Sequence, residues 1–325
     1  NVIFWILLLI GVAYVLDSLG KWESLAGGSG IPQVKGELTG LIKMNWARIL
    51  VAKVTGGVLA IGVGLSLGRE GPSVQLGAAT AKGFSKLLGR TKIEEKYLII
   101  GGASAGLSAA FNAPLAGTVF AVEELAKNFS PAVLISAMSA SLAADFVSKR
   151  VFGLSPIFNV PHLVFLPLNQ YGYLICLGVI AGIFGALFNS TLLRTLDIYG
   201  KIRLPRFIKL TVVFFLATIL GFNLPQILGG GNALVDSLVY ESYGIWLLLL
   251  LWFGKFIFTV LSFSTRVPGG IFLPLLVFGA LTGNICGWLF INLFSINPDL
   301  LPSFTVFAMA ALFTAIVKAP VTGCI

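Results

Sequence analysis

Long stretches without a charged side chain run through this sequence from its first residue to its last. Several of them reach the roughly 20 residues that a helix needs to cross the hydrocarbon of a bilayer. Only 11% of the residues are charged, against roughly 25% in a soluble domain, and the mean hydropathy is +0.96. A signal peptide does not explain the pattern, because apolar runs recur along the whole chain. We therefore expect an all-α, multi-pass integral membrane protein whose uncharged runs are 1–16, 54–68, 97–122, 128–144, 151–193, 210–235, 242–254, 267–298 and 300–317.

The net charge of +9 raises the question of nucleic-acid binding, but the distribution of the charge argues against that function. The densest basic stretch is RTLDIYGKIRLPRFIK (194–209), which separates two apolar segments. The positive-inside rule predicts a cytoplasmic loop there. We expect Cys176, Cys286 and Cys324 to be buried, unpaired thiols, because they lie in apolar runs without metal-ligand spacing. With one histidine in the chain, His162, the sequence predicts no metal site and no cofactor.

The apolar runs are interrupted by glycine and proline, as in FNAPLAG (111–117), NLPQILGGG (223–231) and VPGGIFLP (267–274). An unpaired backbone group in lipid costs several kcal/mol, so that a broken helix persists only where protein or a polar cavity shelters it. Interruptions at matching places in two halves of a chain indicate the binding site of a transporter.

Such matching places are present. The triplets GGS (27–29) and GGG (229–231) precede Pro72 and Pro274, and both pairs are offset by 202 residues. AGLSAAFNAPLAG and AALFTAIVKAPVTG form a third pair, with prolines 114 and 320 offset by 206. The sequence therefore predicts an internal duplication, with inverted topology. We assign 1–125 to the first membrane repeat, 126–171 to a connecting helix and loop, and 172–325 to the second membrane repeat.

The two halves of the duplication differ in their polar side chains. With an offset of 202, Ser29 matches Gly231 and Glu70 matches Phe272. One half thus has a hydroxyl and a carboxylate where the other has bare backbone and an apolar ring. Scaffold positions that match while chemical positions differ are typical of a functional site on a duplicated fold.

The segments GSGIP, GREGP and GGIFLP each place glycine before a proline that suits the first turn of a helix. A helix N-terminus presents unpaired N–H donors and about half a positive charge, which favour a bound anion. Several such termini that converge inside the membrane can hold a partly dehydrated anion and still release it. Lys53 and Arg69 add a more distant attraction, or Lys53 is a lysine at a helix end that reaches for water.

Glu70 lies among these helix starts and is itself a tethered anion. When ionised it can occupy the place of the anion and block the path, and when protonated it can swing away. Burial favours the neutral carboxyl and N-terminal donors favour the ionised one, so that both states are accessible near neutral pH. The alternative is a static ion pair between Glu70 and Arg69. Because acids inside a membrane are functional by default, we favour a gate.

Four motifs, GSGIP (28–32), GREGPSVQLG (68–77), AAFNAPLAGTVFAVEEL (109–125) and PGGIFLP (268–274), resemble the CLC family of chloride channels and chloride/proton antiporters. They occur in the family's order and the likeness runs along the whole chain. The resemblance implies a homodimer of inverted-repeat protomers, each with its own anion pathway, and Glu70 as the gating glutamate. It also implies a chloride site formed by Ser29, Gly30, Ile31, Glu70, Gly71, Ile271, Phe272 and Leu273.

Antiporters of this family carry a second, inward-facing glutamate that passes protons toward the gate, and Glu124 matches its position. The resemblance therefore implies chloride/proton antiport, with a passive voltage- or pH-gated chloride channel as the alternative. If Glu123 and Glu124 only end a helix at the water interface, the channel is favoured. Ser29 stands where family members that prefer nitrate have proline, which favours chloride. We expect a protein of the cell membrane that is not an enzyme.

Compared with the family, the chain lacks the first membrane helix and the closing helices, which include a tyrosine of the chloride site. The resemblance thus implies truncation at both ends. A remote alternative is a rhomboid-like intramembrane serine protease, because GGSG (27–30) fits the GxSG pattern of those enzymes. Such an enzyme needs a base within hydrogen-bond reach of Ser29, and His162 would have to be that base.

Overall fold

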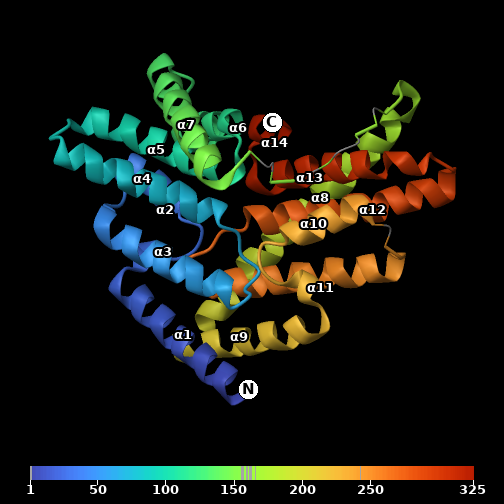
Figure 1. Ribbon diagram of the computed structural model, residues 1–325, viewed down its shortest axis with the longest axis horizontal. Helices are drawn as coiled ribbons and strands as arrows, with labels where there is room; N and C mark the ends of the chain where they lie inside the picture. Colours follow the sequence, from blue (N-terminus) through green and yellow to red (C-terminus); the bar gives the residue numbers. More distant parts are fainter. Residues whose placement is uncertain (1, 155–156, 159, 161–162, 165, 242) are drawn as a thin grey trace.

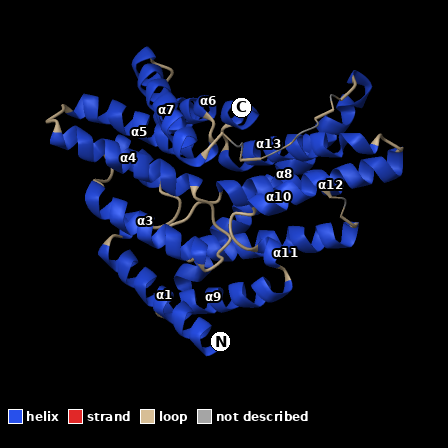
Figure 2. Cartoon of the chain, in the orientation of Figure 1, coloured by secondary structure: helices blue, strands red, loops and turns tan. Residues whose placement is uncertain are grey.

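In the computed structural model of the protein, the described residues are 2–154, 157–158, 160, 163–164, 166–241 and 243–325. All regular elements in these ranges are helical, and several of the loops meet in the middle of the molecule while others lie at its edges (Figure 2). The α-helices are α1 (Val2–Trp22), α2 (Ile31–Leu38), α3 (Trp46–Gly62), α4 (Glu70–Leu87), α5 (Lys92–Phe111), α6 (Pro114–Phe120), α7 (Pro131–Phe152), α8 (Tyr171–Lys201), α9 (Arg206–Asn223), α10 (Asn232–Tyr240), α11 (Ile245–Ser264), α12 (Phe272–Phe294), α13 (Leu301–Val317) and α14 (Pro320–Cys324). Shorter turns are η1 (Ser24–Ala26), the π-helical η2 (Ala121–Ala126), η3 (Leu168–Gln170), η4 (Pro225–Ile227) and η5 (Pro298–Leu300).

The elements of the first half return in the same order in the second half. Figure 1 shows the first set (blue to green) on the left and the second (yellow to red) on the right, with α1 and α9 together at the bottom. The predicted internal repeat of short and broken helices is therefore confirmed, whereas the boundaries at 125/126 and 171/172 stay predictions. The matching elements are α1 and α9, η1 and η4, α2 and α10, α3 and α11, α4 and α12, α5 and α13, and α6 and α14.

The glycine triplets mark the start of α2 and of α10, and there the structure corrects the predicted register by one residue. Gly30 and Gly231 both precede these helices with φ of +93°, a left-handed conformation that glycine adopts without strain. They are therefore equivalent, at an offset of 201. Ser29 matches Gly230 rather than Gly231, because the second half has one residue more between Gly231 and the start of α12 than the first half has between Gly30 and the start of α4. The asymmetry of the duplication persists in this register.

Within the described residues, seven helices are long and apolar enough to cross a membrane. In α12 72% of the apolar window is buried inside the protein, whereas in α1, α8 and α9 the share is 22%. The central position of α12 places its first turn in the protein interior. The shorter helices α2, α6, α10 and α14 cannot span a bilayer, and protein packing must shelter their ends. The candidate spans are Phe4–Trp22, Pro131–Phe152, Leu168–Lys201, Arg206–Asn223, Ile245–Ser264, Phe272–Phe294 and Pro298–Val317.

The two halves share an apolar core. Phe272, from the second half, packs edge-on against Phe120 of the first half, with ring centroids 5.7 Å apart. Phe313 contacts the other side of Phe272 at 5.1 Å. These rings belong to a buried cluster whose other members lie between Ile31 and Ala137. The first turn of α12 is thereby fixed against α6.

The three cysteines are free, but only Cys286 is buried. Cys176 and Cys324 are exposed in this chain, so that their predicted burial is wrong. The prediction took an apolar run as a sign of burial, although a helix of a membrane protein turns much of its apolar surface outward, toward lipid. In the described part of the chain no group of three or more His, Cys, Asp or Glu side chains could hold a metal ion.

Candidate functional site

Three helix starts meet between the two halves, as the sequence predicts. The backbone of Gly28 pairs with the segment before α12: its N–H donates to the carbonyl of Val267, and its carbonyl accepts from Gly269, both at 3.1 Å. A methyl group on Gly71 would lie 2.9 Å from Cβ of Ser29, which shows how closely α4 approaches the start of α2. The first turns of α2, α4 and α12 are thus brought together by backbone contacts that leave no room for side chains.

Glu70 is the first residue of α4, and only 1% of it is exposed. Its carboxylate folds back over Gly68, where a Cβ would collide with Oε2, and lies close to the backbone of Leu273 in the first turn of α12. Oε2 is buried and has no hydrogen-bond partner among the described residues. No ion pair within 4.0 Å joins Glu70 to Arg69 in that part of the chain, so that the static pair is not formed. Glu70 thus places its carboxyl group at the start of α12.

The chloride-site residues named from the sequence fall into these three first turns. Ile31, Gly71, Phe272 and Leu273 are buried, whereas Ser29 and Ile271 are half-buried. Ser29 is the one among them that lines a cavity of about 740 Å³, which also reaches Pro268 before α12. An ion that enters this cavity can therefore approach the hydroxyl of Ser29 and the N-termini of α2 and α12.

Lys53 is fully buried and does not reach for water, contrary to the alternative considered from the sequence. Its ammonium donates to the carbonyls of Ala26 and Gly28, at 3.0 and 2.7 Å. The equivalent Lys255 in α11 donates to the carbonyls of Ile227 and Gly229, both at 2.9 Å. Each lysine therefore holds the turn that leads into α2 or α10. Lys255 was not singled out from the sequence, although its offset of 202 from Lys53 was a usable signal.

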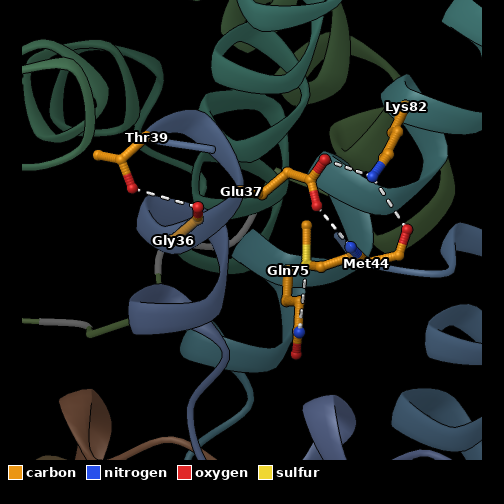
Figure 3. Close-up of polar contacts among 6 residues, drawn as sticks. All are labelled: Gly36, Glu37, Thr39, Met44, Gln75 and Lys82. Atoms are coloured by element: carbon orange, nitrogen blue, oxygen red, sulfur yellow. Dashed lines mark hydrogen bonds and ion pairs between the residues drawn. The ribbon is translucent and has the colours of Figure 1, made fainter. Parts of the chain in front are cut away.

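A polar network fixes α4 on α2 and on the loop that follows it (Figure 3). Lys82 of α4 forms a buried ion pair with Glu37 of α2 and donates to the carbonyl of Met44 at 2.9 Å. The other oxygen of Glu37 accepts from the Met44 N–H. Gln75, one turn beyond the start of α4, contacts Met44 Sδ and donates to the carbonyl of Leu25. These residues escaped the sequence analysis, and they hold the helix that presents Glu70.

Glu124 lies apart from the three helix starts, on the π-helical turn η2. It forms an ion pair with Lys35, near the C-terminal end of α2, and both side chains are partly buried. The neighbouring Glu123 faces another element: its carboxylate accepts from the N–H groups of Val321 and Thr322 and from the Thr322 hydroxyl, at 2.7–3.1 Å. Glu123 therefore caps α14. Of the two acids, Glu124 is the one that contacts α2, through Lys35, and α2 begins directly after Ser29 and Gly30.

The profile of the family described as "Voltage gated chloride channel" matches residues 8–325. The chain belongs to this family. It is 37% identical over 313 residues to "H(+)/Cl(-) exchange transporter ClcA" of Vibrio cholerae serotype O1, with 92% of this chain and 65% of the relative covered. ClcA of Salmonella agona is 36% identical over 323 residues, with 97% of the chain and 68% of the relative covered. The chain thus spans 65% of the length of the Vibrio cholerae proteins that it matches.

Solved structures give the same result for the fold of this voltage-gated chloride channel family member. A slow cyanobacterial Cl-/H+ antiporter superposes with a TM-score of 0.90 at 30% identity, over 98% of this chain and 76% of the other. A CLC-type fluoride/proton antiporter superposes with a TM-score of 0.80 at 24% identity, over 98% and 79%. The predicted inverted-topology, multi-pass membrane fold is confirmed, and so is the family resemblance.

The protease alternative receives no support from the family. Its required base, His162, lies outside the described residues. Ser29 stands at the start of α2 in a family member whose relatives are named as transporters. The two glutamates of the family motifs, in contrast, lie in different environments of the structure, one in the interior and one in a partly exposed ion pair.

Proposed function

We propose that the protein exchanges chloride for protons across a membrane, with Glu70 as the gate. The single observation that carries the proposal is the position of the Glu70 carboxylate, which lies at the first turn of α12, where a helix N-terminus favours an anion. The relatives named as H(+)/Cl(-) exchange transporters support this substrate and this coupling. Chloride, protons and the surrounding lipid are then the partners of the chain.

The gate follows because the Glu70 carboxylate and a chloride ion compete for the same position at the start of α12. Ionised Glu70 satisfies the donors at the start of α12 and keeps a chloride ion away from them. Protonation removes its charge, and the neutral side chain gives up the place to chloride from the Ser29 side. The amides near Gly30, Ile31, Gly71, Ile271 and Phe272 then hold the ion through helix N-termini without a full positive charge, so that the ion can leave again.

We assign the proton supply to Glu124. Its carboxylate is partly exposed and can exchange protons with water, whereas Glu70 is buried. The contact between Phe120, which precedes η2, and Phe272, which precedes Leu273, links the regions of the two acids. These apolar rings cannot carry a proton themselves, so that the proton path we propose runs beside them, through the protein and apart from the cavity at Ser29.

The test uses purified protein in liposomes, with a chloride gradient and a record of both chloride efflux and external pH. We expect wild type to move protons against their gradient. Glu70→Ala and Glu124→Gln should abolish proton movement while chloride still flows. Chloride flow without proton pumping in wild type would instead identify a passive channel, and no chloride flow would refute the proposal.

The site of action and the assembly extend this proposal. We infer the cell membrane as the location and a homodimer as the assembly. The exposed apolar side chains of α7 and α8, such as Phe146 and Ile183, supply surface for lipid or a second protomer. Cross-linking in intact membranes measures the assembly, and a monomeric product would contradict the homodimer.

A further inference from the structure

Arg266 occupies a backbone position that the other half of the molecule gives to glycine. It follows the end of α11 with φ of +55°, and the equivalent Gly64 follows α3 with φ of +92°. The equivalence is firm because α3 and α11, and likewise α4 and α12, are offset by 202 at this junction. Their N–H groups also make matching hydrogen bonds, to the carbonyls of Phe263 and Ile61. A left-handed conformation is strained for arginine and free for glycine.

The strained backbone is held in place by its neighbours. The carbonyl of Arg266 accepts a hydrogen bond of 3.1 Å from Nη2 of Arg206. On the other side it packs against Gly27, where a Cβ would lie 2.7 Å from the same oxygen. Arg206 and Gly27 therefore keep the Arg266 carbonyl in one orientation. Backbone strain that the surroundings maintain is a pointer to function. At this position the function must come from the arginine side chain, because the equivalent Gly64 has none.

Arg266 lines the cavity of about 740 Å³ that reaches Ser29. Arg206 and Lys209 line it as well. The cavity wall also includes Tyr199 and Gly200 at the end of α8, within the basic stretch 194–209 that the positive-inside rule assigns to the cytoplasm. Glu23 is the one acid of the wall among the described residues, and it caps η1 through the Leu25 N–H. The wall thus carries an excess of positive charge.

The cations differ in what they bind. Arg206 donates to a carbonyl and faces Asp17, and Lys209 donates to the carbonyl of Tyr199 at 2.8 Å. The exposed guanidinium of Arg266 has no acceptor among the described residues, and it repels that of Arg206. Like charges held together by the fold, one of them unpaired, form a place for an anion.

We propose that Arg266 captures chloride in this cavity, before the ion reaches the Ser29 hydroxyl. This inference rests on the proposed chloride transport. A positive charge in a cavity with low-dielectric walls raises the local concentration of an anion and its rate of entry. The effect weakens with ionic strength, because salt screens exposed charges over about 10 Å at 0.1 M.

The test compares Arg266→Gly, Arg266→Asn and Arg266→Lys in liposomes, with initial chloride flux recorded against chloride concentration. We expect the glycine and asparagine variants to raise the half-saturating chloride concentration about threefold or more at low ionic strength, with an unchanged rate at saturation. The difference should shrink when an impermeant salt is added. Arg266→Lys should behave like wild type, and Arg150→Gln, which removes an exposed arginine at the end of α7 and away from the cavity wall, should change nothing.

Thermal unfolding separates capture from misfolding. Because glycine relieves the backbone strain, Arg266→Gly should unfold at a temperature at least as high as wild type while its flux at low chloride falls. A wild-type concentration dependence in Arg266→Gly, or a lysine variant as impaired as the glycine variant, would overturn the inference while wild-type transport stands. If wild type itself moves no chloride, the proposed function fails instead.

Discussion

Gly68 and Gly270 donate a hydrogen bond to each other's carbonyl, at 2.7 Å in both directions. The two residues are equivalent in the duplication, so that this reciprocal pair joins the halves at the local two-fold of the repeat. Each is followed within two residues by a helix start, of α4 or of α12. The contact therefore sets the distance between the two N-termini that face the candidate anion site.

We expect Gly270→Ala to destabilise the protein by about 1–3 kcal/mol, the range for overpacking a filled interior. A Cβ there would lie 3.0 Å from the Gly71 nitrogen and 3.2 Å from the Gly68 carbonyl oxygen, and these backbone atoms cannot move aside. Thermal unfolding in detergent measures the loss. The control is Gly178→Ala in α8, where a Cβ meets nothing within 4 Å and should leave stability unchanged or raised. Equal unfolding temperatures for both variants would contradict the packing argument.

Gly68→Ala should act on the gate. The new methyl group would occupy the space into which the Glu70 carboxylate folds, and it would lie 3.2 Å from Leu273 Cβ. The carboxylate must then leave the start of α12. We expect chloride flux to persist while proton movement falls severalfold, as for Glu70→Ala, in the liposome assay. If proton coupling stays at the wild-type level in folded Gly68→Ala, Glu70 does not gate from the observed position.

Much of the fold and of the site could be predicted from glycine and proline alone. Pro32, Pro72 and Pro274 each stand in a first helical turn, as their spacing indicates. These signals are local, because proline fixes φ and suits the start of a helix. Glu70 could also be predicted from the sequence, because a carboxylate in an apolar stretch of a membrane protein is costly and is functional by default.

What escaped prediction depends on contacts between distant segments. The ion pair of Lys82 with Glu37 joins residues 45 positions apart, and periodicity says nothing about such partners. The partner of Glu124 was hidden in the same way. The register error at Ser29 arose because the second half has an extra residue between Gly231 and α12, which only the paired left-handed glycines reveal.

Lys35 should tune the proton step. Lys35 forms an ion pair with Glu124 and so fixes the direction of its carboxylate. In Lys35→Met this partner is lost, and we therefore expect proton movement to fall severalfold while chloride still flows. Lys35→Arg keeps a cation for the pair and should keep the wild-type ratio of proton to chloride movement, and the liposome assay checks both variants. A wild-type ratio in the methionine variant would show that the pair has no part in proton transfer.

Lys53 and Lys255 form a matched pair of buried lysines with the same structural task and different neighbours. Replacing either by methionine removes two buried hydrogen bonds to backbone carbonyls, which we expect to cost about 1–3 kcal/mol of stability for each variant. Only the turn held by Lys53 continues into Ser29, whereas that of Lys255 continues into Gly230. At equal amounts of folded protein, Lys53→Met should therefore raise the half-saturating chloride concentration severalfold, and Lys255→Met should leave it unchanged. An equal loss of chloride transport in both variants would mean that anion binding does not distinguish the two halves, and that the hydroxyl of Ser29 is not part of the site.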